Sequence, residues 1–203
     1  MYNPEVTYKI NKCLFDVYNN LGNIWSEETY ENALEIAFNE VGFQCRRQVE
    51  FDVYYYNYRV GVYRMDLIMD DMLIIELKAL PQIFPVNKAQ IISYLKGTKK
   101  PIGLLVNFGQ ERKVFFQYFP NKVTAKCLDI HFDKEKTNIQ EQLPLLLLEK
   151  SKAVLEYLGP GYFHQVYQRA MNYELRMLDT PYQKIFKIEA NFRGQLVGAK
   201  EVR

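Results

Sequence analysis

Three ionisable residues stand in two apolar segments of the chain, where charge is unusual. Asp66 lies in YRMDLIM, and Glu76 and Lys78 lie two residues apart in MLIIELKAL. In an extended strand, residues two apart project from the same face. Burying charges costs solvation free energy unless they pair with one another or bind a metal. The pattern predicts a metal site beside a lysine; the alternative is a buried ion-pair network without catalysis.

A turn at Asp70-Asp71 would bring the three groups together. An antiparallel hairpin around it puts Asp66 near position 75, beside Glu76. Mg²⁺ takes oxygen ligands, commonly one or two carboxylates, and keeps water for a substrate phosphate. Such a metal polarises a phosphodiester and lowers the pKa of a bound water, while Lys78 would orient that water or neutralise developing charge. We therefore expect phosphodiester chemistry at this hairpin.

Two further pairs of residues fall at helical spacing. Ser26 is a plausible N-cap, and Glu27 and Tyr30 share one face of the helix that follows it. Gln90 and Tyr94 form an i, i+4 pair on the helix after the Glu76 segment. Taken alone, each pair is more typical of exposed or capping residues than of an active site.

The periodicity along the chain predicts the elements that must position these residues. Apolar residues recur at helical spacing in some segments and alternate or run together in others. Helices are expected over 4–21, 27–41 and 86–98, and strands over 49–55, 58–69, 72–79, 102–108 and 113–119. The third helix makes a crossover, so the strands on either side of it can be parallel neighbours. Residues 120–142 are polar and are predicted to form a connector.

Three stretches of the chain resemble, in one order and without large gaps, the GxxExxY proteins of the PD-(D/E)XK nuclease superfamily. They are LGNIWSEETYENALEIAFNEVGF, VYYYNYRVGVYRMDLIMDDMLIIELKAL and KAQIISYLKGTKKPIGLLVNFG, within residues 6–118. The resemblance implies an α/β fold with a restriction-endonuclease-like core, a mixed central sheet flanked by helices, over residues 1–119. It also implies nuclease activity on nucleic acid, with DNA favoured over RNA.

The resemblance assigns a role to each matching residue. It implies that Asp66 and Glu76 bind Mg²⁺ or Mn²⁺ with the carbonyl of Leu77, and that Glu27 is an additional acidic ligand. Lys78 matches the catalytic lysine, and Gln90 matches a polar contact to water or phosphate.

Other matching positions are expected to contact nucleic acid: Arg64, Tyr94 and Lys96. For the basic residues the alternative is a solvated surface. The chain departs from the pattern at Ile24, where the family has glycine, and at Asn87, where histidine is common. Neither change removes an expected metal ligand.

The C-terminal part resembles the start of the same family. Tyr167 and Val197-Gly198 follow Tyr30 and Val60-Gly61 by the same 137 residues, but His164 stands at the position of Glu27. We expect residues 143–203 to be a truncated second copy, an α+β half-repeat that stops opposite Asp66 and has no metal site of its own. Its apolar side chains should pack on the first copy or on a partner chain: Phe163, Val166, Leu175, Phe186 and Ile188.

Composition narrows the possible partners and compartment. The net charge of +2 is nearly balanced, so contact with nucleic acid should be local. Cys13, Cys45 and Cys127 lie far apart, which argues against a zinc site and against a disulfide framework. No apolar run is long enough for a membrane span, so the expected location is intracellular, cytoplasmic or phage-associated. The main alternative to a nuclease is a non-cleaving nucleic-acid-binding or assembly protein, with a homodimer or partner contact through the half-copy.

Overall fold

The computed structural model describes residues 3–121, 142–178 and 187–201, which fall into two compact units, Met1–Met171 and Asn172–Arg203. The expected connector, 120–142, therefore lies almost wholly outside the described residues. The first unit begins with elements in the predicted order of two helices, three strands, one helix and two strands. They are α1 (Pro4–Leu21), α2 (Glu27–Glu40), β1 (Cys45–Tyr55), β2 (Tyr58–Met69), β3 (Leu73–Lys78), α3 (Pro85–Thr98), β4 (Ile102–Asn107) and β5 (Phe115–Pro120).

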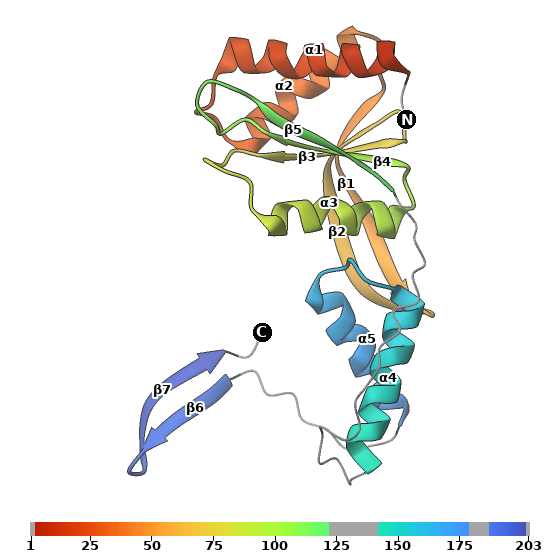
Figure 1. Cartoon of the computed structure of the whole chain (residues 1–203), viewed down its shortest axis with the longest axis vertical. Coiled ribbons are helices and arrows are strands. Elements are labelled where there is room, and N and C mark those ends of the chain that lie inside the picture. The colour runs from red at the N-terminus through yellow and green to blue at the C-terminus, as the bar shows by residue number, and fades with distance from the viewer. Residues whose placement is uncertain (1–2, 122–141, 179–186, 202–203) are drawn as a thin grey trace. The chain divides into compact units, whose positions relative to one another are not determined.

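The five strands form one mixed sheet in the order β1-β2-β3-β4-β5 (Figure 1). β3 and β4 run parallel, as the crossover through α3 predicts, and the other neighbouring strands are antiparallel. Every residue of β3 is buried. A central strand covered on both faces reads as a continuous apolar run, so a charge on it is exceptional.

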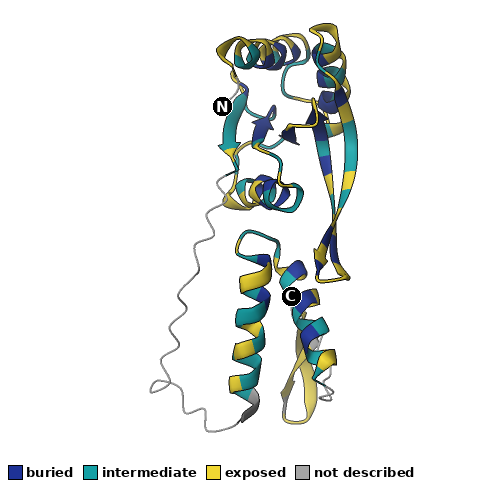
Figure 2. Cartoon of the chain, turned by 90° about the vertical axis from the view of Figure 1, so that its right-hand side faces the viewer, coloured by how far each residue is buried: buried dark blue, intermediate teal, exposed yellow. Residues whose placement is uncertain are grey.

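The helices cover both faces of the sheet (Figure 1), and buried residues concentrate between the layers (Figure 2). Leu73, Ile75 and Leu77 pack in a core with α1 and α2, whereas Ile74 packs in a second core with α3. Side chains alternate along a strand, so Glu76 and Lys78 share the face of Ile74. The two charged side chains of β3 therefore point to the layer that contains α3.

Two more helices follow, α4 (Gln142–Leu158) and α5 (His164–Met177), and α5 crosses the boundary between the units. Phe163 N–H donates to the Tyr63 hydroxyl at 3.1 Å, and a Cβ placed on Gly61 would lie 3.2 Å from Val166. Phe163 and Val166 therefore pack on β2, as expected for these two residues of the C-terminal part. No helix within the described ranges is long and apolar enough to cross a bilayer.

The second unit contains an antiparallel hairpin, β6 (Lys187–Phe192) and β7 (Gln195–Glu201), with a bulge between Ala190 and Asn191. The hairpin of β1 and β2 has its own bulge between Val53 and Tyr54. Ile188, expected to be packed, is 60% exposed on β6.

Leu175 is half-buried in the part of α5 that belongs to the second unit, and Phe186 and Cys127 lie outside the described residues. Cys13 and Cys45 are free thiols buried in the core that α1 and α2 form with the sheet.

Candidate active site

The turn between β2 and β3 lies at Asp70-Asp71, as predicted. Both residues have positive φ angles, +50° and +55°, and Met72 N–H donates to the carbonyl of Met69 at 3.0 Å. Asp70 also accepts from the N–H of Gln44 at 2.8 Å, which fixes the turn to the start of β1. Aspartate tolerates the left-handed region better than most residues, so this pair suits the turn.

The register of the hairpin differs from the prediction by one residue. Met69 pairs with Leu73, so Met72 lies outside the ladder, and Leu67 pairs with Ile75. Continuing this register places Asp66 across from Glu76 and not near position 75. The error arose because the prediction counted only the two turn residues. The correction makes Asp66 and Glu76 direct cross-strand neighbours.

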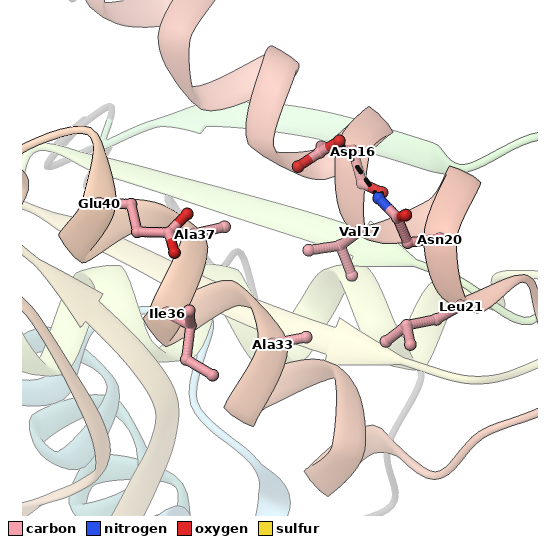
Figure 3. A pocket seen from close by; sticks show the side chains of 8 residues that line it. All are labelled: Asp16, Val17, Asn20, Leu21, Ala33, Ile36, Ala37 and Glu40. Carbon is pink, nitrogen blue, oxygen red and sulfur yellow. Dashed lines mark hydrogen bonds between the residues drawn. The ribbon is translucent and has the colours of Figure 1, made fainter.

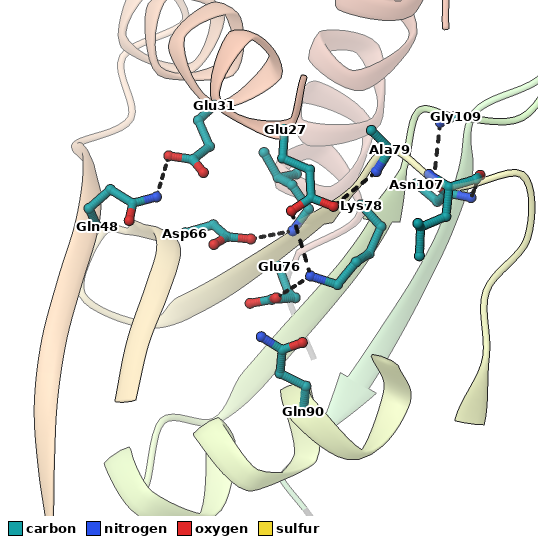
Figure 4. Close-up of polar contacts among 12 residues, drawn as sticks. Glu27, Glu31, Gln48, Asp66, Glu76, Lys78, Ala79, Gln90, Asn107 and Gly109 are labelled. Atoms are coloured by element: carbon teal, nitrogen blue, oxygen red, sulfur yellow. Dashed lines mark hydrogen bonds and ion pairs between the residues drawn. The ribbon is translucent and has the colours of Figure 1, made fainter. Parts of the chain in front are cut away.

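Glu76 and Lys78 form the centre of the site. Lys78 Nζ donates to Glu76 Oε1 at 2.6 Å, while Glu76 Oε2 is buried without a hydrogen-bond partner among the described residues (Figure 4). Burial, and next the charge of Asp66, raise the pKa of Glu76 to about 8. Burial lowers the pKa of Lys78, but the carboxylates of Glu76, Glu27 and Asp66 outweigh it, so that pKa is raised.

Asp66 is held against the backbone of β3. Its Oδ2 accepts from Leu77 N–H at 2.7 Å. Burial raises the pKa of Asp66, although the Leu77 N–H and the charge of Lys78 both oppose the rise. Two carboxylates with raised pKa values on adjacent strands are typical of a functional site, because their environment disfavours the charge that a cation would stabilise.

Glu27 reaches the same place from the start of α2. Ser26 caps this helix through Thr29 N–H, so Glu27 lies in the first turn. Its Oε1 accepts from Ala79 N–H at 3.2 Å, and its Oε2 lies 4.0 Å from Lys78 Nζ. The predicted meeting of Glu27, Asp66, Glu76 and Lys78 at the end of β3 is therefore present in the structure (Figure 4).

Tyr30 fixes the segment that leads into α2. Its hydroxyl donates to the Gly22 carbonyl at 2.9 Å and accepts from Trp25 N–H at 3.2 Å. Its ring is fully buried and stacks on Phe108 with centroids 4.4 Å apart. Tyr30 thus ties the turn before Glu27 to the end of β4, which makes its role structural.

Gln90 points from α3 toward Glu76 and Lys78 (Figure 4). Its Nε2 donates to the Tyr94 hydroxyl at 2.8 Å, and burial raises the pKa of Tyr94. Tyr94 itself is only 5% exposed, which suits it to supporting Gln90.

The two basic residues expected to contact nucleic acid lie in different settings. Arg64 is exposed on β2, two residues before Asp66, and its charge opposes the rise in the pKa of Asp66 that burial causes. Lys96 is half-buried on α3, and its Nζ donates to the carbonyl of Pro160 in the turn between α4 and α5. The structure thus brings Arg64 near the site and engages the ammonium of Lys96 elsewhere.

A further acidic residue near the site, Glu31, was missed in the sequence. Glu31 lies one turn after Glu27, is 4% exposed, and accepts from Gln48 Nε2 at 2.5 Å. Burial raises the pKa of Glu31, and the charge of Asp66 adds to the rise. Gln48 has a φ of +53° where the β1–β2 register brings it across from Asp66. The i, i+4 spacing of Glu27 and Glu31 was the available signal, whereas the backbone strain at Gln48 left none.

The chain segment that leaves β3 is pinned by β4. Asn107, fully buried, accepts from Leu80 N–H at 2.9 Å and donates to the Leu80 carbonyl at 2.8 Å. A Cβ on Gly109 would lie 2.3 Å from the Leu80 nitrogen, so only glycine fits there. These contacts fix where the chain turns away beyond Lys78.

The two departures from the family pattern lie outside the cluster of charges. Asn87 caps α3, because its Oδ1 accepts from Phe84 N–H at 2.8 Å. Ile24 is 80% exposed in the turn before α2. Neither residue alters the groups that face Glu76.

A shallow hollow between α1 and α2 lies apart from this cluster (Figure 3). Its apolar lining is flanked by Asp16 and Glu40. Acidic rims repel phosphates, so the hollow is a poor candidate for a nucleic-acid site.

The donors at the end of β3 fit a hard divalent cation. Within the described parts of the chain, no group of three or more His, Cys, Asp or Glu side chains forms a ready-made metal cage. Mg²⁺ commonly takes one or two carboxylates and fills its remaining positions with water and phosphate. Asp66 and Glu76 supply two carboxylates, and the buried Glu76 Oε2 has no hydrogen-bond partner among the described residues, so a cation could take it as a ligand.

Comparison with known proteins places the chain in a family. The family model described as "PD-(D/E)XK nuclease superfamily" matches residues 4–119 and 142–202. No curated protein matches the chain. A solved structure titled "Crystal structure of SSO0001" is 19% identical with a TM-score of 0.37, over 59% of this chain and 60% of its own length, a likeness too low to carry an argument. The family match covers most of the sequence, and the chain belongs to the PD-(D/E)XK nuclease superfamily.

Proposed function

We propose that this chain is a Mg²⁺-dependent nuclease that hydrolyses phosphodiester bonds, in DNA rather than RNA, with Mn²⁺ as an alternative ion. One observation carries the proposal. Glu76 is fully buried next to Lys78, and its Oε2 has no hydrogen-bond partner among the described residues. An unpaired buried carboxylate oxygen costs free energy, and a bound cation would offset that cost.

Each residue of the cluster would have its own task. Asp66 and Glu76 hold the metal with the carbonyl of Leu77, and Glu27 is the additional acidic ligand. The metal, when bound, supplies Lewis-acid stabilisation of the phosphate charge. Lys78 orients the attacking water or neutralises charge that develops on the phosphate oxygens.

Residues around the cluster would hold the substrate. Gln90 contacts the water or the phosphate from α3. The exposed guanidinium of Arg64, whose charge acts on Asp66, contacts the nucleic-acid backbone. Tyr94 and Lys96 were expected to contact nucleic acid too, but their burial and bonds suit them to supporting α3.

A cleavage assay tests the proposal directly. Linear, circular and single-stranded DNA and RNA are incubated with the full chain and Mg²⁺ or Mn²⁺, beside the variants Lys78→Ala and Asp66→Ala. Wild-type protein should cut DNA, and each variant should lose about 100-fold or more in rate, the usual effect of removing a charge-stabilising group. Cleavage that survives both changes would overturn the proposal.

A second candidate is a protein that binds nucleic acid or serves in an assembly without cutting. The direct 2.6 Å bond of Lys78 to Glu76 favours it, since the pair can satisfy part of its own charge. The nearly balanced net charge of +2 also suits it. Metal-independent binding of DNA without cleavage, in the same assay, would select this candidate.

We further propose that residues 143–203 are a second copy of the first part of the nuclease domain at 1–119. The turn before α5 supports this. Tyr167 OH donates to the Gly159 carbonyl at 2.7 Å and accepts from Tyr162 N–H at 3.1 Å, the two bonds that Tyr30 makes 137 residues earlier. The bulge of the β6–β7 hairpin, between Ala190 and Asn191, is displaced by the same interval from that of β1 and β2.

The second copy offers a surface for a homodimer or a partner protein. β7 is exposed along its whole length, and one edge of that strand has no neighbour within the described sheet of two strands. Unpaired strand edges are templates for association. Sedimentation of the full chain tests this: a concentration-independent monomer would count against a homodimer.

A further inference from the structure

The turn between α4 and α5, residues 159–163, is fitted closely to α3. A Cβ on Gly159 would lie 2.7 Å from Lys96 Nζ, and one on Gly161 would lie 3.6 Å from the Ile92 side chain. Both glycines have positive φ angles, +64° and +113°, which other residues rarely adopt. The backbone of the turn thus lies against α3, in a conformation that favours glycine.

Lys96 fastens this turn to α3. Its Nζ donates to the carbonyl of Pro160 and lies 5.2 Å from the ring centroid of Tyr162. Burial lowers the pKa of Lys96. A carbonyl and an aromatic face both stabilise an ammonium group, so Lys96 binds the turn through a hydrogen bond and a cation–π contact together.

Aromatic side chains continue the contact toward the active site. Phe163 N–H donates to the Tyr63 hydroxyl at 3.1 Å, and the two rings lie edge to face with centroids 5.7 Å apart. The Tyr63 ring lies 5.5 Å from that of Tyr94, and Phe51 meets both rings edge to face, at 5.4 Å from Tyr63 and 5.8 Å from Tyr94. Such pairs have preferred geometries and resist displacement.

The last link is the bond from Gln90 Nε2 to the Tyr94 hydroxyl, 2.8 Å long. Gln90 in turn points to Glu76 and Lys78 (Figure 4). A continuous path of contacts thus runs from Phe163 through Tyr63 and Tyr94 to Gln90, which faces the ion pair of Glu76 and Lys78.

We propose that the 159–163 turn is a positioning element of the active site. It contacts Lys96 on α3 and Tyr63 on β2, and through these two residues it holds α3 and Gln90 in place. The kinetic effect of this positioning rests on the nuclease function proposed above. It gives the turn, which lies outside the cluster of Glu27, Asp66, Glu76 and Lys78, a task in the active site. Lys96 becomes a positioning residue in place of a phosphate contact.

Two conservative variants of the full chain test it. Tyr63→Phe removes the hydroxyl that accepts from the turn and keeps the ring, and Lys96→Met removes the ammonium and keeps the stem. Each should lower kcat for DNA about 3- to 10-fold with little change in KM, because misplacing a group in the site slows the chemical step. Lys88→Met, on the same helix and without a described bond to the turn, is the matched control and should match wild type.

A double-mutant cycle separates positioning from other effects. In a Gln90→Ala background, neither Tyr63→Phe nor Lys96→Met should lower kcat further, since the group they position is gone. An equal loss in both backgrounds would overturn the proposal. So would a raised KM for Lys96→Met together with a shallower salt dependence, which would identify Lys96 as a phosphate contact.

A measurement without turnover keeps the test independent of the nuclease function. The side-chain amide signals of Gln90 in an ¹⁵N-correlated NMR spectrum are identified by their loss in Gln90→Ala. They should move or broaden in Tyr63→Phe and Lys96→Met and stay in place in Lys88→Met. Unmoved signals would refute the positioning role even if the protein cuts DNA. Wild-type protein that cuts nothing would refute the function and leave this readout to decide the role of the turn.

Discussion

Lys78 Nζ lies 2.6 Å from Glu76 Oε1, and both side chains leave β3 on the face that α3 covers. The pair is nearly sealed from solvent, with side chains 11% and 1% exposed. Removing one member of a buried ion pair leaves the charge of the other member uncompensated. Burying both charges also costs solvation free energy, so such a pair is more informative about function than about stability. The second carboxylate oxygen of Glu76, Oε2, has no hydrogen-bond partner among the described residues.

The stability of the metal-free protein should fall as the pH rises from about 5 to 8. The pKa of Glu76 is raised from 4.5 to about 8, so in this interval the folded state binds a proton that the unfolded state has released. Stability from this group is fully present below pH 4.5 and is lost as the pH passes 8. The slope would reach about 1.4 kcal/mol per pH unit for one proton. Denaturant unfolding at several pH values, in a chelator, measures it.

Glu76→Gln is the matched variant for that experiment. The amide cannot titrate, so the variant should lose less stability than wild type between pH 5 and 8. Raised pKa values at Asp66 and Glu31 leave a residual slope of the same sign. Parallel curves for wild type and variant would show that Glu76 is ionised in the folded protein throughout.

Mg²⁺ or Mn²⁺ should raise the melting temperature of the wild-type protein. A ligand that binds only the folded state stabilises it by about 2.7 kcal/mol at 100 times its Kd. Asp66→Asn and Glu76→Gln should lose this shift, because each removes one of the two carboxylates. Asp71→Asn changes an exposed carboxylate in ion pairs with Arg46 and Lys100 and should keep it. A shift that persists in both site variants would place the metal elsewhere.

Tyr30→Phe and Tyr167→Phe should destabilise the first unit by similar amounts. Each substitution removes a hydroxyl that makes two hydrogen bonds to the backbone of the turn before its helix, which is α2 for Tyr30 and α5 for Tyr167. Loss of such bonds costs about 1–3 kcal/mol when a backbone group is left without a partner. Calorimetry of the full chain compares the two. If Tyr30→Phe unfolds at the wild-type temperature, Tyr30 does not fix the turn before Glu27.

Gly109→Ala should destabilise the fold strongly. Its new Cβ would lie 2.3 Å from the Leu80 nitrogen and 2.4 Å from the Ala79 carbonyl carbon, and backbone atoms cannot move aside without displacing the end of β3. A cost of about 3 kcal/mol or more is expected for such overpacking. Gly198→Ala, where nothing lies within 4 Å, is the control and should be neutral. A Gly109→Ala protein as stable as the control would contradict the close approach.

Local patterns in the sequence predicted most of the architecture. The 3.6-residue period marked α1 and α2 almost to their ends, and the apolar run at 72–79 marked β3 as a strand buried on both faces. These signals are short-range, because periodicity and capping depend on neighbours along the chain. The two-residue spacing of Glu76 and Lys78 alone predicted that they share a face.

Register and strain were harder to predict. The register at Asp66 was wrong by one residue, because whether Met72 pairs or is left out of the ladder depends on packing and not on the turn residues alone. The positive φ of Gln48 had no local signal, since glutamine does not favour that conformation. Strain of this kind is maintained only when the surrounding structure compensates for it.

Residue type and spacing in the sequence were enough to select Asp66, Glu76 and Lys78, whereas Glu27 was added by the resemblance to the GxxExxY proteins. The positions of Glu31 and Gln48 beside them, and the bond of Lys96 to the turn at Pro160, became apparent only in the folded chain. Those pairings join residues 17 and 64 positions apart in the chain. Which distant groups meet depends on how the sheet, α3 and the second helical pair pack together, and no local pattern of residues encodes that.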